Sequence, residues 1–180
     1  MKQEEPLFLG AYLWLQTLVG VLVGMVLLFM LVGRLTPVSG DSMLSTLHEG
    51  DWMVVRSIGY QPRQGDVVVL TKEFDNVEGP IVKRVLAVAG QQVDIDYAAG
   101  TVSVDQTVLE ESYLPEEMVQ QSWQRIDSIT VPEGELFVLG DNRNVSNDSR
   151  NPALGTVDVR YVLGGAEWIA FPFSRLGSIQ

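Results

Sequence analysis

Lys83 is the residue whose surroundings point most directly to chemistry. It lies within an apolar run, residues 81–88, that has the composition of a buried β-strand. Alternate residues of a strand share a face, so the side chain of Lys83 is expected to lie with those of Val85 and Ala87, and that of Arg84 on the opposite face. Because burial disfavours a charged amine, the pKa of Lys83 is predicted to fall below the ordinary lysine value of about 10.4.

A neutral lysine beside a serine hydroxyl can act as a general base, and Ser-Lys pairs are a known variant of the nucleophile–base arrangement. The candidate hydroxyl belongs to Ser42, in residues 39–47, which read Ser-Gly-Asp-Ser-Met-Leu-Ser-Thr-Leu. Two simpler interpretations stay open on these residues alone. Ser42 would only solvate an exposed turn, and Lys83 would extend its amine into water from an edge strand.

A third polar stretch, residues 140–150, is rich in turn formers and in charge. It does not fit a calcium-binding loop, because Arg143 and Val145 occupy positions where such a loop carries oxygen ligands. We interpret it as a loop in which charged side chains brace one another and Ser146 is free to hydrogen-bond a buried amine. A solvated turn is the alternative. The bracing side chains would be those of Asp141, Arg143, Asp148 and Arg150.

The composition excludes several other classes of site. The 180 residues carry a net charge of −11, which argues against a nucleic-acid partner because such partners require a basic surface. The sequence has no cysteine, which excludes disulfides and cysteine-based metal sites. The single histidine, His48, lies beside Glu49 in a predicted turn and is interpreted as a solvated loop residue. The sequence therefore predicts no metal and no cofactor.

The N-terminal region has the pattern of a membrane helix. Residues 7–33 carry no charge, and as a helix they would span about 40 Å, more than the roughly 30 Å hydrocarbon core. The stretch is apolar on all faces and too long for the apolar region of a signal peptide. We predict a transmembrane helix at about residues 12–32. The chain would then divide into a tail (1–6), an anchor (7–35) and one domain (36–180).

After Arg34 the sequence changes to short β-type runs separated by Gly, Pro and Asp. A hairpin turn is expected at Ala99-Gly100. Residues 110–125 are acidic and polar, and two interpretations stay open: an excursion from the sheets or a short helix at 115–121. The pattern indicates a mostly β domain. The predicted strands are 52–57, 66–70, 81–89, 92–97, 101–104, 128–131, 135–139 and 161–170.

Taken together, these stretches resemble the type I signal peptidases, the membrane-bound Ser-Lys enzymes that remove signal peptides. Residues 42–47 resemble the family motif Ser-Met-x-Pro-Thr-Leu, and Lys83-Arg84-Val85 resembles its general-base motif. Residues 140–150 match the family pattern Gly-Asp-Asn-Arg-x-x-Ser-x-Asp-Ser-Arg at every specified position. The resemblance implies a mostly β catalytic domain of coiled antiparallel sheets on a single N-terminal transmembrane helix.

The resemblance also implies a role for each matching residue. Ser42 would be the nucleophile, with its backbone N–H as an oxyanion donor, and Lys83 would be the general base. Ser146 would hold the lysine amine, and Asp148 would brace the site by pairing with a nearby arginine. The arginines grouped with these supporting residues are Arg84 and Arg150. Shallow pockets for the small substrate residues at −1 and −3 would be lined by Val38, Met43, Leu47 and Val82.

Two positions near Ser42 depart from the family pattern, as do residues 88–91, which replace the usual Leu-Pro-Gly-Asp after the base. Ser45 stands where the motif usually has proline, and Gly40 stands where some bacterial members carry a serine that aids the oxyanion. These changes bear on the rate more than on the class of enzyme.

The implied partners are preproteins that carry signal peptides and a lipid bilayer crossed by one helix, with the enzyme expected to be a monomer. The implied location is a bacterial plasma membrane, with the N-terminus in the cytoplasm and the catalytic domain outside. Two alternatives are kept open: a specialised peptidase with one dedicated substrate, and a catalytically silent membrane-anchored binding module.

Overall fold

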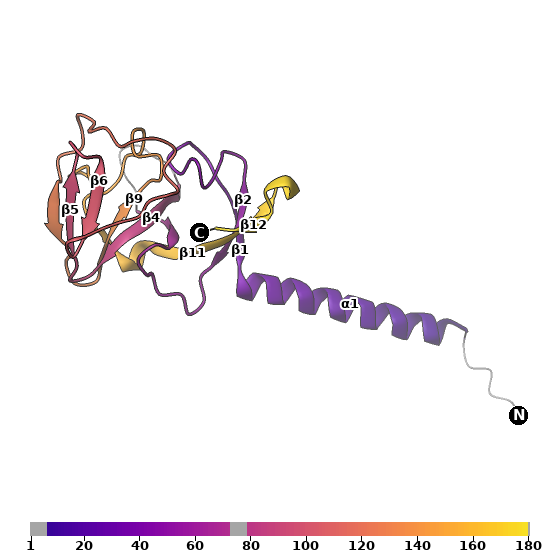
Figure 1. Cartoon of the computed structure of the whole chain (residues 1–180). Coiled ribbons are helices and arrows are strands. Elements are labelled where there is room, and N and C mark those ends of the chain that lie inside the picture. Colours follow the sequence, from indigo (N-terminus) through magenta and orange to yellow (C-terminus); the bar gives the residue numbers. More distant parts are fainter. Residues whose placement is uncertain (1–6, 73–78, 180) are drawn as a thin grey trace, which may run out of the picture.

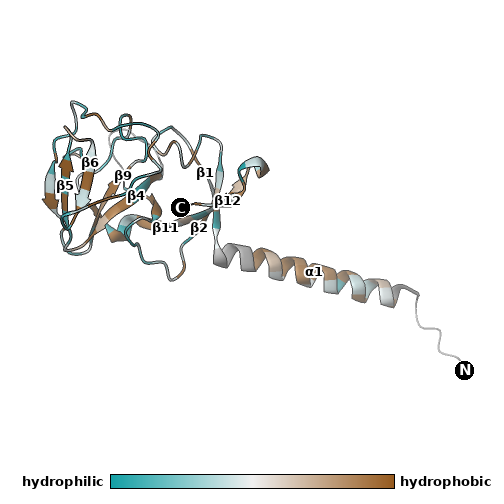
Figure 2. Cartoon of the chain, in the orientation of Figure 1, coloured by the Kyte–Doolittle hydropathy of each residue, from teal (hydrophilic) through white to brown (hydrophobic). Residues whose placement is uncertain are grey.

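A long helix, α1 (Leu7–Val32), projects from a β domain in the computed structural model, which describes residues 7–72 and 79–179 (Figure 1). The side chains of residues 9–27 are all exposed, and Figure 2 shows hydrophobic residues along this length. The stretch Leu9–Leu27 is long and apolar enough to cross a membrane, and none of its residues is buried by the β domain. Apolar surface of this extent is what a bilayer covers.

The joint between the helix and the domain is short. Strand β1 (Arg34–Pro37) begins two residues after the last residue of the helix. Only Gly33 separates the two elements, and a Cβ there would lie 2.9 Å from a methyl carbon of Val54. A glycine therefore allows the chain to turn against the neighbouring strand.

The main sheet is antiparallel throughout and curls around the domain. In spatial order its strands are β1, β2 (Trp52–Arg56), β11 (Val162–Phe171), β3 (Val67–Leu70), β4 (Ile81–Val88), β9 (Glu135–Leu139) and β10 (Val157–Asp158). Strand β12 (Gly177–Ser178) also pairs with β11. Two short 3₁₀ helices, η1 (Val159–Tyr161) and η2 (Phe173–Arg175), flank β11.

A second, smaller antiparallel sheet covers part of the first. Its order is β7 (Thr107–Val108), β6 (Thr101–Val104), β5 (Gln92–Asp96) and β8 (Ser128–Thr130). A core cluster joins the two sheets, with Val93 and Val102 from the small sheet packed with Leu86 and Phe137 from the main one. This core fixes the direction in which β4 and β9 enter the rest of the domain.

All eight predicted strands are present, with their ends shifted by no more than one residue. The predicted turn at Ala99-Gly100 joins β5 to β6, and Gly100 has a φ of 69°, which glycine adopts without strain. Of the two alternatives for residues 115–121, the short helix is wrong, because that segment is an irregular chain in the structure. The sequence patterns also missed β1, β7, β10 and β12.

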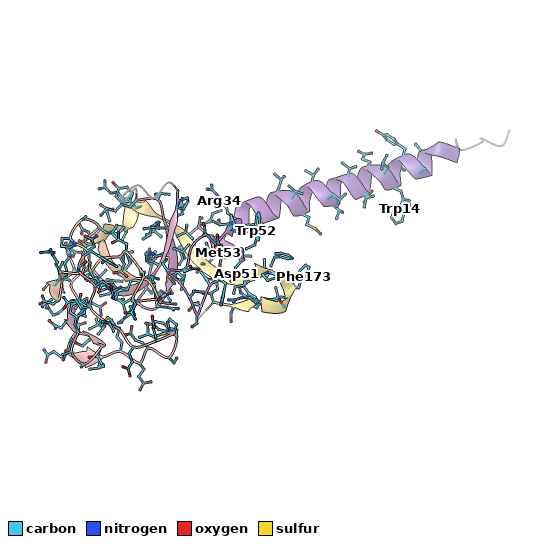
Figure 3. All side chains as sticks on the ribbon, turned by 90° about the horizontal axis from the view of Figure 1, so that it is seen from above. Trp14, Arg34, Asp51, Trp52, Met53 and Phe173 are labelled. Carbon is cyan, nitrogen blue, oxygen red and sulfur yellow. The ribbon has the colours of Figure 1, made fainter. Side chains whose placement is uncertain are left out.

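Several exposed aromatic residues lie on the side of the β domain that faces the helix. Figure 3 shows Trp52 and Phe173 on the side of the β domain from which α1 projects, with Trp52 near Arg34, which begins the first strand. The Phe173 side chain is 78% exposed, and Phe171 packs edge-on against it with ring centroids 5.7 Å apart. Aromatic side chains of this kind are enriched where a protein meets the membrane–water interface.

Candidate functional site

The central contact of the site joins Lys83 and Ser42. Lys83 lies in β4, paired with Val68 of β3, and its side chain is only 4% exposed. Ser42 lies in the turn between β1 and β2, and its Oγ is 2.7 Å from Lys83 Nζ. A charged amine donates this hydrogen bond, whereas a neutral amine accepts it from the hydroxyl. The structure therefore brings the two candidate residues into direct contact.

Burial lowers the pKa of Lys83 to about 8. Loss of hydration is the largest cause, and the positive charge of Arg150 acts in the same direction. The carboxylates of Asp148 and Asp141 act against it. Lys83 has no carboxylate within ion-pair distance among residues 7–72 and 79–179, so burial dominates. A substantial fraction of the amine is neutral slightly above neutral pH.

In strand β4, the alternation of side chains between the two faces of the sheet is interrupted just after Lys83. Its register against β9 shifts between Val85 and Ala87, so that one extra residue is accommodated in β4. As a result Ala87 packs with Leu86 in the core between the sheets, while Val85 belongs to a different cluster. The expectation that Ala87 shares the face of Lys83 and Val85 is therefore wrong. Arg84 does point away from Lys83, toward Asp141.

The loop of residues 140–150 is held closely against β9. The backbone N–H of Ser149 donates to Val138 O, and Val138 N–H donates to the Ser149 hydroxyl, each over 3.0 Å. Asp148 accepts a hydrogen bond from the N–H of Gly140 and is paired with Arg150 at 2.8 Å. Both side chains of this ion pair are fully buried. The predicted pairing of Asp148 with a nearby arginine is present.

The other two charged residues of the loop reach beyond it. Asp141 accepts two hydrogen bonds from the Arg84 guanidinium, at 2.8 and 2.7 Å. Arg143 pairs with Glu111, far away in sequence, and both side chains are buried. The expectation that all four charged residues brace one another within the loop is therefore only half right. The two external pairs connect the loop to β4 and to residues 109–126.

Ser146 lies at the back of the Ser42 turn. A Cβ added to Gly140 would lie 2.3 Å from Ser146 Oγ and 2.5 Å from the Ser42 carbonyl oxygen, so glycine permits their close approach. The hydroxyl of Ser146 is buried, but its oxygen has no hydrogen-bond partner in the described part of the chain. Lys83 Nζ contacts Ser42 instead. The role predicted for Ser146 toward the amine stays a prediction.

The Ser42 turn is also fixed from the loop side. Asn142 donates its backbone N–H to Ser42 O over 3.0 Å and its side-chain amide to Asp41 O over 3.1 Å. The backbone N–H of Ser42 donates to no backbone carbonyl among the described residues. This N–H is therefore available to a bound group.

The residues expected to line substrate pockets come together in one apolar cluster. Val38, Met43 and Leu47 are buried in it, and Val82 packs against it from the strand position before Lys83. These side chains come from both sides of Ser42 and from β4, so the cluster adjoins the Ser42–Lys83 contact.

Three contacting residues were missed by the sequence reasoning. Thr46 accepts a hydrogen bond from Arg84 and donates one to Asp141, although only its motif position was noted. Glu111 and Tyr113 contact Arg143 and Arg84 from the polar region of residues 110–125. Because Glu111 and Tyr113 are distant in sequence from their arginine partners, no local sequence pattern indicates these contacts.

Two further side chains, those of Lys72 and His48, form contacts outside the site. Lys72 donates hydrogen bonds to the carbonyls of Leu154 and Thr156. His48 is exposed, as expected, and its ring contacts Arg175.

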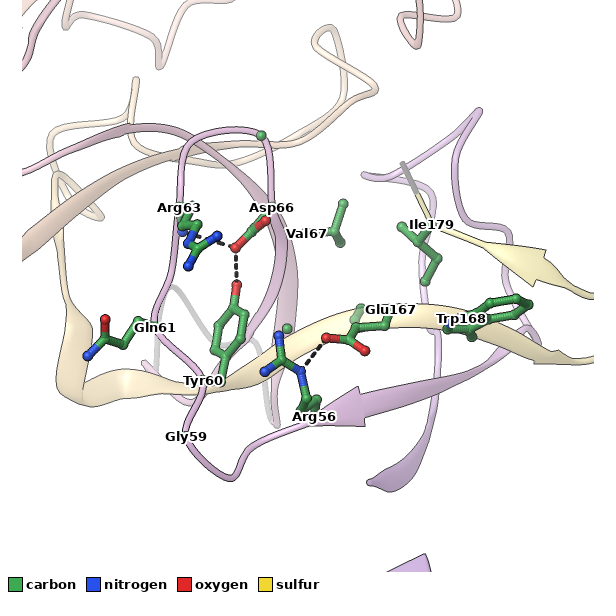
Figure 4. Close-up of a pocket in the computed structure, with 13 residues that line it drawn as sticks. Arg56, Gly59, Tyr60, Gln61, Arg63, Asp66, Val67, Glu167, Trp168 and Ile179 are labelled. Carbon is green, nitrogen blue, oxygen red and sulfur yellow. Dashed lines mark hydrogen bonds and ion pairs between the residues drawn. The ribbon is translucent and has the colours of Figure 1, made fainter. Parts of the chain in front are cut away.

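A cavity of about 500 Å³ lies elsewhere, between β2, β3 and β11 (Figure 4). Neither Ser42 nor Lys83 lines it. Its polar side chains are paired with each other: Arg56 with Glu167, and the Tyr60 hydroxyl with Asp66. No group of three metal-ligating side chains occurs in the parts of the chain described.

Residues 11–171 match the family described as signal peptidase, peptidase S26. The chain belongs to this family. Membership makes it a serine endopeptidase and a membrane enzyme, in keeping with its candidate membrane span.

Relatives from bacteria are similar to this chain over most of their own length. The probable signal peptidase I-1 of Synechocystis sp. is 35% identical over 151 residues, covering 79% of this chain and 73% of the relative. The signal peptidase I of Bacillus licheniformis is 33% identical over 149 residues, 77% of each chain. A crystal structure of a signal peptidase I from Enterococcus faecalis has 29% identity and a TM-score of 0.48, covering 58% of this peptidase and 96% of that chain.

Proposed function

We propose that this peptidase removes signal peptides from exported preproteins with Ser42 as the nucleophile and Lys83 as the general base. The observation that carries the proposal is the 2.7 Å contact between Ser42 Oγ and a buried amine whose pKa is lowered to about 8. A hydroxyl is a weak nucleophile until a nearby base removes its proton. A lysine that is partly neutral near physiological pH can take that proton.

The proposed reaction has two stages. Neutral Lys83 takes the proton from Ser42 Oγ while the oxygen bonds to the carbonyl carbon of the scissile peptide. The C–N bond then breaks, the leaving amine takes the proton from Lys83, and an acyl ester remains on Ser42. In the second stage Lys83 deprotonates a water that attacks the ester, and the proton returns to Ser42 Oγ as the ester bond breaks.

The surrounding residues would position the substrate. The Ser42 N–H would donate to the oxyanion that forms at the carbonyl. The apolar cluster of Val38, Met43, Leu47 and Val82 would accept small side chains at −1 and −3. Asp148, Arg150 and Arg84 would keep the loop and β4 in place, and the Ser146 hydroxyl would hold the amine during turnover.

We also propose a bacterial plasma membrane as the location, with the N-terminus in the cytoplasm and the catalytic domain on the other side. The short joint at Gly33 and the exposed aromatic residues beside the helix end support a domain that lies close to the bilayer. We propose that the enzyme acts there as a monomer. A cleavage site that emerges from the membrane would then meet Ser42 near the lipid surface.

The experiment that tests the proposal compares the Ser42→Ala and Lys83→Met variants with the parent protein in detergent. Both variants are expected to lose preprotein cleavage, a fall of about a thousandfold or more. Both should keep the folded circular dichroism spectrum, because neither change breaks an ion pair. Lys83→Met also removes a buried amine and so should not lower the denaturation midpoint at pH 7. Cleavage that persists in either folded variant would reject the pair.

A further inference from the structure

The segment of residues 109–126 lies across the loop of residues 140–150 and is fixed there by several contacts. We call it the strap. Its Glu111 forms the buried ion pair with Arg143, and the side chain of Asn144 bonds to the strap backbone at Glu117 and Val119. Further along, Gln124 donates to Arg143 O, and the N–H groups of residues 125 and 126 donate to Arg150 O. The strap thus contacts the loop at Arg143, Asn144 and Arg150.

The strap also contacts the strand that carries the base. The Tyr113 ring covers the Arg84 guanidinium, whose central carbon lies 4.1 Å from the ring centroid. Arg84 is the residue next to Lys83, and its guanidinium also binds Asp141, the Gly65 carbonyl and Thr46. A cation covered by an aromatic face and held by four hydrogen bonds has little freedom to move.

A single carboxylate connects these two sets of contacts. Glu111 accepts a hydrogen bond from the Tyr113 hydroxyl at 2.7 Å and from the Arg143 guanidinium at 3.1 Å. Arg143 in turn donates from Nε to the carbonyl of Gly140, the residue that lies against Ser146 and the Ser42 carbonyl. Burial, and then Glu111, raise the pKa of the Tyr113 phenol, so that it remains a hydrogen-bond donor.

The Ser42 turn is reached from the same side. Ser45 donates its hydroxyl to the backbone carbonyl of Tyr113 over 2.8 Å, and Thr46 bonds to both Arg84 and Asp141. Ser45 stands where the family motif has proline, which has no hydroxyl to donate. In this chain the turn after Ser42 is therefore tied to the strap by a hydrogen bond that the usual motif lacks.

We propose that Glu111 and Tyr113 are positioning residues of this peptidase, which hold Ser42 and Lys83 at reactive distance and keep water away from the amine. The proposal rests on the assignment of these two residues as the catalytic pair. Glu111 acts through Arg143 and Gly140, and Tyr113 acts through Arg84. Loosening either contact would hydrate the region around Lys83, which would return its amine toward ordinary lysine behaviour.

The test measures kcat/KM for preprotein cleavage from about pH 6 to about pH 10 with the full chain in detergent. Tyr113→Leu removes the aromatic face from Arg84, and Glu111→Gln removes the charge opposite Arg143. Glu116→Gln is the matched control, because it makes the same charge change on the strap with an exposed side chain that has no hydrogen bond or ion pair among the described residues.

For both test variants the rising part of the pH profile should move to higher pH by at least about half a unit. The value of kcat/KM at pH 7 should then fall at least about threefold and recover toward the parent value at alkaline pH. Glu116→Gln should follow the parent profile. A loss of folded protein alone would lower kcat/KM by the same factor at every pH, without moving the rise.

The other outcomes separate the positioning role of the strap from the assignment of the catalytic pair. An unmoved profile in both folded variants would overturn the positioning role, while the assignment of Ser42 and Lys83 would still stand on their own variants. If Glu111→Gln fails to fold, Tyr113→Leu and the milder Tyr113→Phe carry the test. If none of the three folds, the strap serves stability only and the proposal is wrong. A parent enzyme without any rise near pH 8 would instead contradict the proposed base.

Discussion

The loop of residues 140–150 and the cavity between β2, β3 and β11 use the same kind of ion pair in opposite surroundings. Asp148 and Arg150 are fully buried, whereas the side chains of Arg56 and Glu167 are 45% and 40% exposed. Water screens the second pair and competes for its hydrogen bonds, but it does not reach the first. The buried pair therefore determines where the loop lies, while the exposed pair is expected to leave the fold unchanged when it is removed.

Lys83 belongs to the buried region but lacks an ionic partner of its own among residues 7–72 and 79–179. The three buried arginines nearby each have a carboxylate within ion-pair distance. In the described part of the chain, the Lys83 amine has the Ser42 hydroxyl as its hydrogen-bond partner. The difference explains why burial changes the proton affinity of this residue: a paired cation keeps its charge, whereas an unpaired one can give up its proton.

The largest effect on stability is expected from the buried pair. Asp148→Asn would leave the Arg150 guanidinium buried beside a neutral group and remove part of the support of the loop. We expect a loss of about 3–5 kcal/mol in the free energy of unfolding, measured by denaturant titration of the detergent-solubilised protein. A loss smaller than that of an ordinary surface substitution would contradict the role assigned to burial.

A smaller effect is expected from pH. Lys83 must be neutral to accept a proton, so kcat/KM should rise with pH through an apparent pKa of about 8 and fall about tenfold per unit below it. The lowered pKa also means that the unfolded chain binds more protons between pH 8 and 10.5, so this residue should make stability increase with pH across that range. A rise centred near the ordinary lysine pKa would show that the amine is hydrated.

The smallest effect is expected at the cavity. Glu167→Gln should produce no resolvable change in the denaturation midpoint or in cleavage, because both partners of the Arg56 pair remain accessible to water. Added salt should not enlarge the difference. If this variant lost as much stability as Asp148→Asn, burial would not be what separates the two regions.

The sequence predicted eight of the strands because each carries β-branched or aromatic residues bounded by turn formers. The missed strands are of two kinds. Strands β7, β10 and β12 have two residues each, too few for any periodicity. Strand β1 has four residues, and the apolar helix before it hides its beginning. Such short strands are defined by backbone hydrogen bonds to neighbouring strands. The local sequence pattern does not indicate which strands will pair.

The site was predictable to a similar degree. A lysine inside an apolar strand and a serine in a matching motif pointed to the contact that the structure contains. Local spacing also suggested that Asp141 and Arg143 would pair within their own loop, but Arg84 and Glu111 approach them from elements that are distant in sequence. The register shift in β4 was equally invisible, because no glycine or proline marks it.

The single-residue joint at Gly33 has a consequence for which bonds can be cut. Strand β1 starts directly after the helix and is locked to β2, and Ser42 follows β1 after four residues. On the proposed function and location, the Ser42 hydroxyl would therefore be held at a constant height above the lipid. A preprotein would then be cut where its chain crosses that height. The length of the preprotein's own membrane segment would select the bond that is cut.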